Sequence, residues 1–203
     1  MSNSSSVFGG TPANIMNKVY VIEVENSNLD IVKNDKEIPN LYQILNQNSQ
    51  RNIDILEIMN IIIDKYKDLK ICIIYHEKNH VNILYRKLKE NNKSIEIYTY
   101  YNVFPTSQIV LVNSLFIKDT YNNFDYNFDI LIDMIGKTPS QVETNFNIIN
   151  KSTSLNNKIY FQFCVTGHSI LNNKHQKIID TLSRLCNRNL YYKLYTTKTK
   201  YIK

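Results

Sequence analysis

Short apolar runs alternate with segments of helical spacing along most of this chain, and this alternation limits the folds open to it. The runs are rich in Ile, Val and Leu with few polar interruptions, which is typical of strands buried on both faces of a parallel sheet. Strands are therefore predicted at residues 18–24, 70–75, 95–98, 108–112, 128–133 and 158–165. Apolar residues three or four positions apart predict helices. They occur at residues 50–67, 80–90, 138–150 and 169–188, and a short helix is also expected at 41–45.

Strands and helices that alternate in this way connect by right-handed crossovers. We therefore expect an α/β fold, a three-layer sandwich with a mostly parallel sheet, over residues 51–188. Residues 1–50 are expected to form an N-terminal strand and an irregular linker. Residues 189–203 are expected to form a basic Tyr/Lys-rich tail, which is a candidate edge strand. Ligands of such sheets bind beyond the carboxyl ends of the strands, so the loops there are the candidate sites.

The scarcity of glycine excludes the common nucleotide-binding loops. The four glycines are Gly9, Gly10, Gly136 and Gly167. No two of them have the spacing of a dinucleotide fingerprint or of a complete phosphate loop. An intact, self-sufficient nucleotidase of that type is therefore excluded.

One partial match to a phosphate loop remains at Gly136, Lys137 and Thr138, between a predicted strand and a predicted helix. The earlier glycine that such a loop needs is Leu131 here, and Pro139 removes an amide donor from the helix start. Two interpretations stay open. The helix start contacts a nucleic-acid phosphate, or it is a plain strand–turn–helix junction.

Charge and cysteine content indicate the surroundings of the protein. Lys and Arg total 24 against 18 Asp and Glu, a formal net charge of +6, which fits an anionic partner such as nucleic acid or a solvated basic tail. The cysteines, Cys72, Cys164 and Cys186, have neither disulfide nor metal spacing, which favours a reducing intracellular compartment. No signal peptide or membrane-spanning run is visible, so a cytoplasmic protein without a membrane partner is expected.

Histidines and carboxylates are candidate catalytic groups. His76, Glu77 and His80 match the short H-E-x-x-H pattern of zinc metalloproteases. Because His76 directly follows a predicted strand rather than lying within a helix, the two rings need not face one metal ion. A zinc hydrolase using His76 and His80 stays as an alternative, with no third ligand evident. Asp129 and Asp133 share one strand face without a completing partner, so a structural role is predicted for them.

Four segments follow one another in an informative order. Residues 10–12 read Gly-Thr-Pro, residues 71–75 form an apolar run followed by His80, residues 114–125 run from Ser to Asp, and residues 142–151 lie in a predicted helix. They are similar to the end of motif III and to motifs IV, V and VI of superfamily 2 helicases. The chain thus resembles the C-terminal RecA-like half of such a helicase, particularly the viral type. The resemblance implies a RecA-like fold of the P-loop NTPase class.

The same resemblance implies that catalytic groups are missing. Asn123 replaces the glycine of motif V, and the Gln, Gly and two Arg places of motif VI hold Thr144, Asn147, Ile148 and Lys151. An arginine finger of this kind contributes about 10³–10⁵ in rate. We therefore expect no catalytic residues, no metal, no cofactor and no ATP hydrolysis by this chain alone. ATP would bind only if a partner chain supplied the missing half, and its contacts would then be Asp125 and Lys151.

The resemblance implies a non-catalytic subunit that binds nucleic acid or assembles with a protein partner in viral or plasmid-type replication or transcription. Its place would be the host cytoplasm or the virion. The residues expected to contact nucleic-acid phosphates at the strand ends are Lys78, Ser114, Lys118, Lys137 and Thr138. The alternative is a purely structural protein–protein module on a decayed RecA-like scaffold.

Overall fold

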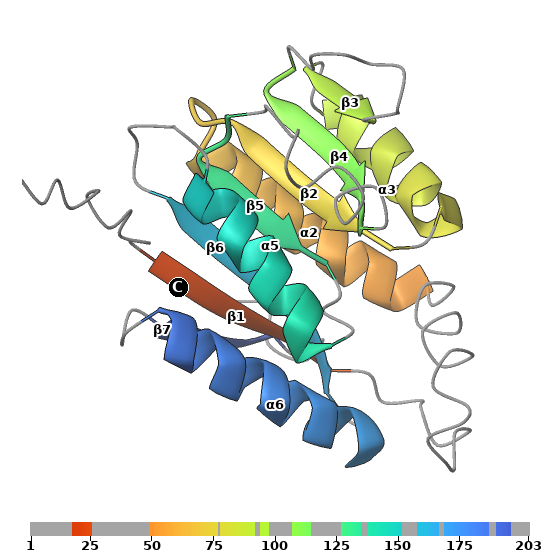
Figure 1. Cartoon of the computed structure of the whole chain (residues 1–203). Coiled ribbons are helices and arrows are strands. Elements are labelled where there is room, and N and C mark those ends of the chain that lie inside the picture. The colour runs from red at the N-terminus through yellow and green to blue at the C-terminus, as the bar shows by residue number, and fades with distance from the viewer. Residues whose placement is uncertain are drawn as a thin grey trace, which may run out of the picture.

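The computed structural model describes residues 18–25, 49–76, 78–91, 94–97, 107–114, 127–134, 138–151, 158–166, 169–186 and 190–195 (Figure 1). The strands are β1 (Lys18–Glu25), β2 (Ile71–Tyr75), β3 (Ile95–Ile97), β4 (Ile109–Asn113), β5 (Ile130–Asp133), β6 (Ile159–Thr166) and β7 (Leu190–Tyr195). The helices are α2 (Ser49–Lys65), α3 (Lys78–Asn91), α5 (Pro139–Lys151) and α6 (Ser169–Leu185). Each predicted strand and helix that falls on described residues is present, and the short helix expected at 41–45 lies outside them.

The strands form one seven-stranded sheet in the order β3-β4-β2-β5-β6-β1-β7. Every pair of neighbours is parallel, so the expected parallel sheet is confirmed. In the centre of the sheet, Ile73 of β2 pairs with Leu111 of β4 and with Ile132 of β5. Because the strands are parallel, their carboxyl ends all lie at the same edge of the sheet.

Both ends of the described chain contribute to this sheet. Strand β1 lies between β6 and β7, with Val19 opposite Tyr160 on one side and Leu190 on the other. Strand β7 from the basic tail forms one edge of the sheet, and β3 forms the other. The sheet therefore includes strands from both sides of the 51–188 region.

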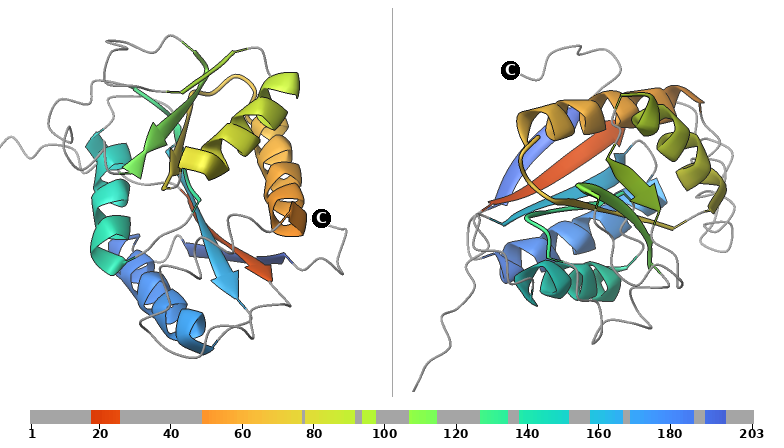
Figure 2. Two further views of the ribbon diagram at one scale, coloured as in Figure 1. Left: turned by 90° about the vertical axis from the view of Figure 1, so that its right-hand side faces the viewer. Right: turned by 90° about the horizontal axis from the view of Figure 1, so that it is seen from above.

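Helices cover both faces of the sheet, as expected for a three-layer sandwich. Helices α2 and α3 lie on one face, and α5 and α6 lie on the other (Figures 1 and 2). Alternate residues of β2 enter the two cores: Ile71 and Ile73 pack with α2 and α3, while Cys72 and Ile74 pack with α5 and α6. Each buried Ile side chain contributes about 1.5–3 kcal/mol through removal from water. Burial on both faces explains why these runs carry so few polar residues.

The start of α5 follows the predicted Thr-Pro signal. The Oγ1 atom of Thr138 accepts a 3.2 Å hydrogen bond from the backbone N–H of Gln141, and Pro139 is the first helical residue. Thr138 thus caps the helix, and the missing amide of Pro139 costs nothing in the first turn.

Two further sequence expectations concern the cysteines and the membrane. All three cysteines are free and buried, and burial raises the pKa of the Cys72 and Cys164 thiols, which stay protonated. None of the described helices is long and apolar enough to span a membrane.

Candidate functional site

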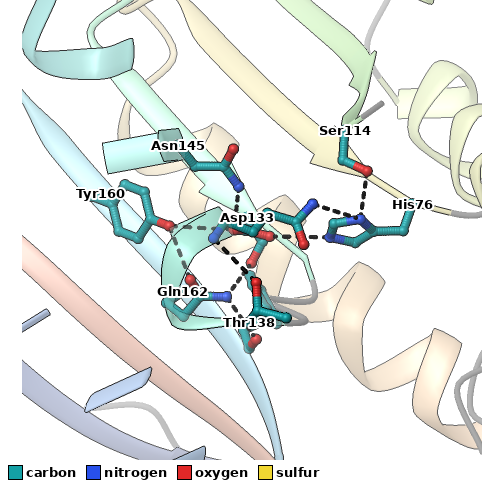
Figure 3. A network of polar contacts seen from close by, with 9 residues as sticks. His76, Ser114, Asp133, Thr138, Asn145, Tyr160 and Gln162 are labelled. Atoms are coloured by element: carbon teal, nitrogen blue, oxygen red, sulfur yellow. Dashed lines mark hydrogen bonds and ion pairs between the residues drawn. The ribbon is translucent and has the colours of Figure 1, made fainter. Parts of the chain in front are cut away.

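Three polar side chains meet at the carboxyl ends of neighbouring strands. His76 directly follows β2, Ser114 directly follows β4, and Asp133 is the last residue of β5 (Figure 3). The sheet order β4-β2-β5 places His76 between the other two. Residues far apart in the sequence therefore form one cluster at the edge where parallel sheets bind ligands.

The ring of His76 contacts a different group at each nitrogen. Its Nδ1 atom lies 2.6 Å from Oγ of Ser114 and 3.4 Å from Nε2 of Gln141, a residue of α5. Its Nε2 atom lies 3.7 Å from Oδ1 of Asp133, which is beyond hydrogen-bond range. The side chains of His76 and Asp133 are 2% and 0% exposed, so their interaction is shielded from solvent.

A buried hydrogen-bond network fixes the carboxylate of Asp133. Asn145 of α5 donates to Oδ2 at 2.7 Å, and the hydroxyl of Tyr160 lies 3.3 Å from the same oxygen. The Tyr160 hydroxyl also lies 2.9 Å from Oε1 of Gln162, and its single proton is donated to one of these two oxygens at a time. Burial, and then the negative charge of Asp133, raise the pKa of Tyr160 well above its usual value. Tyr160 therefore remains a hydrogen-bond donor.

Gln162 closes this network from strand β6. Its Nε2 atom donates to the backbone carbonyls of Phe163, at 3.1 Å, and of Asp133, at 3.4 Å. Gln141, Asn145, Tyr160 and Gln162 were not among the predicted site residues. Gln162 is a polar residue inside a mostly apolar strand, and this position is a signal in the sequence of a buried polar contact.

The two histidines of the H-E-x-x-H pattern have different partners. His80 lies in the first turn of α3, and its Nε2 atom is 2.9 Å from Oδ1 of Asn52 in α2. Burial, followed by the charges of Arg51 and His76, lowers the pKa of His80 to about 3, so its ring is neutral near pH 7. Across the described part of the chain, no group of three His, Cys, Asp or Glu side chains is arranged to hold a metal ion.

Asp129 and Asp133 lie at opposite ends of the 129–133 segment. Asp129 is buried just before β5, where its Oδ2 atom accepts a 2.9 Å hydrogen bond from the backbone N–H of Lys70. Asp133 ends the strand. The two carboxylates therefore do not form an acid–base pair, and Asp129 has the structural role expected for it.

Two of the predicted phosphate contacts have described side chains. Ser114 is buried, with 7% of its surface exposed, whereas Thr138 is exposed at the start of α5. Gln141 connects them, because its backbone N–H binds Thr138 and its side chain reaches His76 beside Ser114. Lys78 is the first residue of α3 and Lys151 the last of α5, with side chains outside the described set. The residues Lys118, Asp125 and Lys137 lie wholly outside the described residues.

Solved structures share this arrangement of strands and helices. T4 UvsW matches 91% of this chain with a TM-score of 0.62 at 14% identity. The C-terminal domain of the DEAD-box protein Dbp5 matches 92% of this chain and 93% of its own, with a TM-score of 0.53 at 10% identity. This chain has the fold of the C-terminal RecA-like domain of a superfamily 2 helicase. The fold expected from the resemblance is thus confirmed.

The match to longer proteins covers only part of them. This chain spans 42% of the UvsW chain. A structure of Saccharomyces cerevisiae Dbp5 L327V bound to Gle1 H337R and IP6 matches 90% of this chain, with a TM-score of 0.52 at 10% identity. This chain again spans 42% of that longer chain. By sequence, no protein-family model and no curated protein matches the chain.

The resemblance sets Ile148 at the place of the first motif VI arginine, and in this fold Ile148 is a core residue. Ile148 of α5 is 6% exposed and packs in the cluster that α5 and α6 form against the sheet, together with Phe146 and Ile149. A side chain at position 148 therefore points into the core. Thr144, at the Gln position, binds its own helix by donating a 3.0 Å hydrogen bond to the carbonyl of Ser140.

Proposed function

We propose that this domain binds the phosphate backbone of a nucleic acid as a non-catalytic subunit of a viral or plasmid-type replication or transcription complex. The observation that carries the proposal is the polar cluster at the strand ends, where Ser114, Thr138 and Gln141 lie together. Hydroxyl and amide groups are common ligands of phosphate oxygens and contact them without reading sequence. The net charge of +6 supports an anionic partner.

The place of Ile148 supports a non-catalytic role. An arginine finger must reach the transferred phosphate, and Ile148 is both uncharged and packed in the core. Hydrolysis of ATP would therefore require an arginine and a phosphate loop in addition to these residues.

The test is the affinity for fluorescent single-stranded DNA and RNA, measured by polarisation over a range of salt concentrations. Binding to phosphates predicts an affinity that falls steeply with salt, with a log–log slope of about −0.7 per neutralised phosphate. Lys118→Ala and Lys137→Ala should each reduce this slope by about 0.7. Lys177→Ala, on the exposed surface of α6, is the matched control and should leave it unchanged. Absent or salt-insensitive binding would overturn the proposal.

The second candidate is a protein–protein module without nucleic acid. One observation favours it: a structure that shares this fold is of Dbp5 bound to another protein, Gle1. A stable protein partner that co-purifies with the chain after nuclease treatment, together with no binding to either oligonucleotide, would select this function over the first.

A further inference from the structure

The contacts of His76 define which of its nitrogens carries the proton when the ring is neutral. Two donors, the Ser114 hydroxyl and the Gln141 amide, lie within 2.6 and 3.4 Å of Nδ1, while a carboxylate oxygen of Asp133 faces Nε2 at 3.7 Å. A proton on Nε2 points at the carboxylate, and the lone pair on Nδ1 accepts from both donors. The opposite tautomer would set a nitrogen lone pair against a carboxylate. These contacts favour the tautomer of neutral His76 that carries its proton on Nε2.

This tautomer decides what Ser114 can offer to a ligand. In this tautomer the single hydroxyl proton of Ser114 is donated to Nδ1 of His76, and the Ser114 oxygen offers only lone pairs to a ligand. Phosphate oxygens are acceptors as well, and two acceptors repel each other. Because Ser114 is only 7% exposed, a ligand meets one edge of this residue, and the direction of its proton decides the contact.

Protonation of His76 reverses the hydrogen bond. A proton on Nδ1 donates to the Ser114 oxygen and leaves the hydroxyl proton of Ser114 free for a phosphate oxygen. In that state the amide of Gln141 would turn so that its carbonyl oxygen, instead of its nitrogen, faces the ring. The imidazolium also gains a charge partner, since the Asp133 carboxylate lies 3.7 Å from Nε2.

We propose that phosphate binding at Ser114 is coupled to the uptake of one proton by His76. This inference rests on the proposed nucleic-acid binding and adds its regulation. The domain would then hold a phosphate backbone more tightly as the pH falls. Asp133, held by Asn145 and Tyr160, positions the ring that controls the serine.

The charged or titratable groups near His76 and its neighbour His80 lie on three elements, β5, α3 and α2. Asp133 of β5 supplies a negative charge, with Oδ1 at 3.7 Å from Nε2. His80 of α3 is neutral because burial, followed by the charges of Arg51 of α2 and of His76, lowers its pKa to about 3. Ser114 and Gln141 carry no charge. The side chains of Glu77 and Lys78, next in the chain, lie outside the described set. Asp133 is thus the charged group whose contact with the His76 ring the structure shows, at 3.7 Å.

The experiment measures the affinity for a fluorescent single-stranded oligonucleotide from about pH 5.5 to about pH 8 at constant ionic strength, across the range in which histidines titrate. If one proton is taken up, the wild-type affinity falls by up to about tenfold per pH unit as the pH rises. His76→Asn and Ser114→Ala should each flatten this dependence. His175→Gln is the matched control. His175 lies in α6, with Nε2 at 2.6 Å from Oε1 of Glu23 in β1, and this variant should retain the pH dependence of the affinity.

Calorimetry in two buffers of different ionisation enthalpy measures the proton directly. Net uptake by the wild type that His76→Asn abolishes supports the coupling. Salt-dependent binding with a pH dependence that His76→Asn leaves unchanged overturns the coupling and leaves the proposed function standing. Absence of binding at every pH and salt concentration overturns both.

Discussion

Asn145 donates a 2.7 Å hydrogen bond to Oδ2 of Asp133 and so joins helix α5 to the end of strand β5 inside the protein. The two residues are 2% and 0% exposed. A carboxylate in such a place depends on its donors, because water cannot replace one that is lost. This contact therefore supports both the packing of α5 and the position of the carboxylate that faces His76.

Replacing Asn145 by Ala should lower the free energy of unfolding by about 1–3 kcal/mol, because it leaves a buried acceptor unsatisfied. Chemical denaturation followed by circular dichroism measures this loss. Asn172→Ala, at an exposed position on α6, should change stability by less than about 0.5 kcal/mol. Equal losses in the two variants would show that the hydrogen bond to Asp133 contributes nothing.

Two adjacent isoleucines of α2 provide a test of how this helix packs. Ile62 is 5% exposed and lies in the core, whereas Ile61 is 48% exposed. Ile62→Ala should cost about 2–5 kcal/mol of unfolding free energy because it leaves a cavity. Ile61→Ala should stay within about 0.5 kcal/mol of the wild type. The same denaturation experiment distinguishes them, and a reversed order would mean that α2 presents another face to the sheet.

An arginine at position 148 should destabilise the fold and should not produce ATPase activity. Ile148→Arg places a charge in the core and should cost at least about 3 kcal/mol of unfolding free energy, without ATP hydrolysis. Asn147→Arg, at the neighbouring half-buried position, is the control and should cost less than about 1 kcal/mol. A stable Ile148→Arg variant with ATPase activity would contradict both expectations.

Stability should fall when the pH drops below the ordinary range of histidine. In the folded protein the pKa of His80 is lowered to about 3, by burial first and then by Arg51 and His76. The unfolded chain binds a proton there near pH 6.5, so acid favours unfolding between the two values. Between about pH 6.5 and about pH 5, protonation of His80 in the unfolded chain should lower the free energy of unfolding by about 2 kcal/mol. Denaturation of the wild type and of His80→Gln at both pH values measures the effect. An identical pH dependence in the two proteins would exclude it.

The elements of the fold were predictable because each one is encoded locally. The apolar run at residues 70–75 gave strand β2, and the helical spacing from residue 50 gave α2, with ends that differ by one or two residues. The order of the strands was not predictable, because nothing in β1 itself shows that it pairs with β6 and β7. Such pairings join residues far apart in the chain and depend on the packing of the whole domain.

The candidate site was predictable only in separate parts. The sequence predicts a phosphate contact for Ser114, offers zinc binding as an alternative for His76, and predicts a structural role for Asp133. Their meeting depends on the order β4-β2-β5, which no local pattern contains. Gln141 and Asn145 joined them because one face of α5 packs against these strand ends.

By itself, the sequence determined the layers of this protein and the absence of a complete phosphate loop, because hydrophobic spacing and glycine positions are local properties of the chain. Only the tertiary structure decided that His76 lies between a serine and a carboxylate and that Ile148 faces the core. Those relationships depend on which strands are neighbours and on how α5 is turned against the sheet. Both are set by burying the apolar faces of all the elements at once.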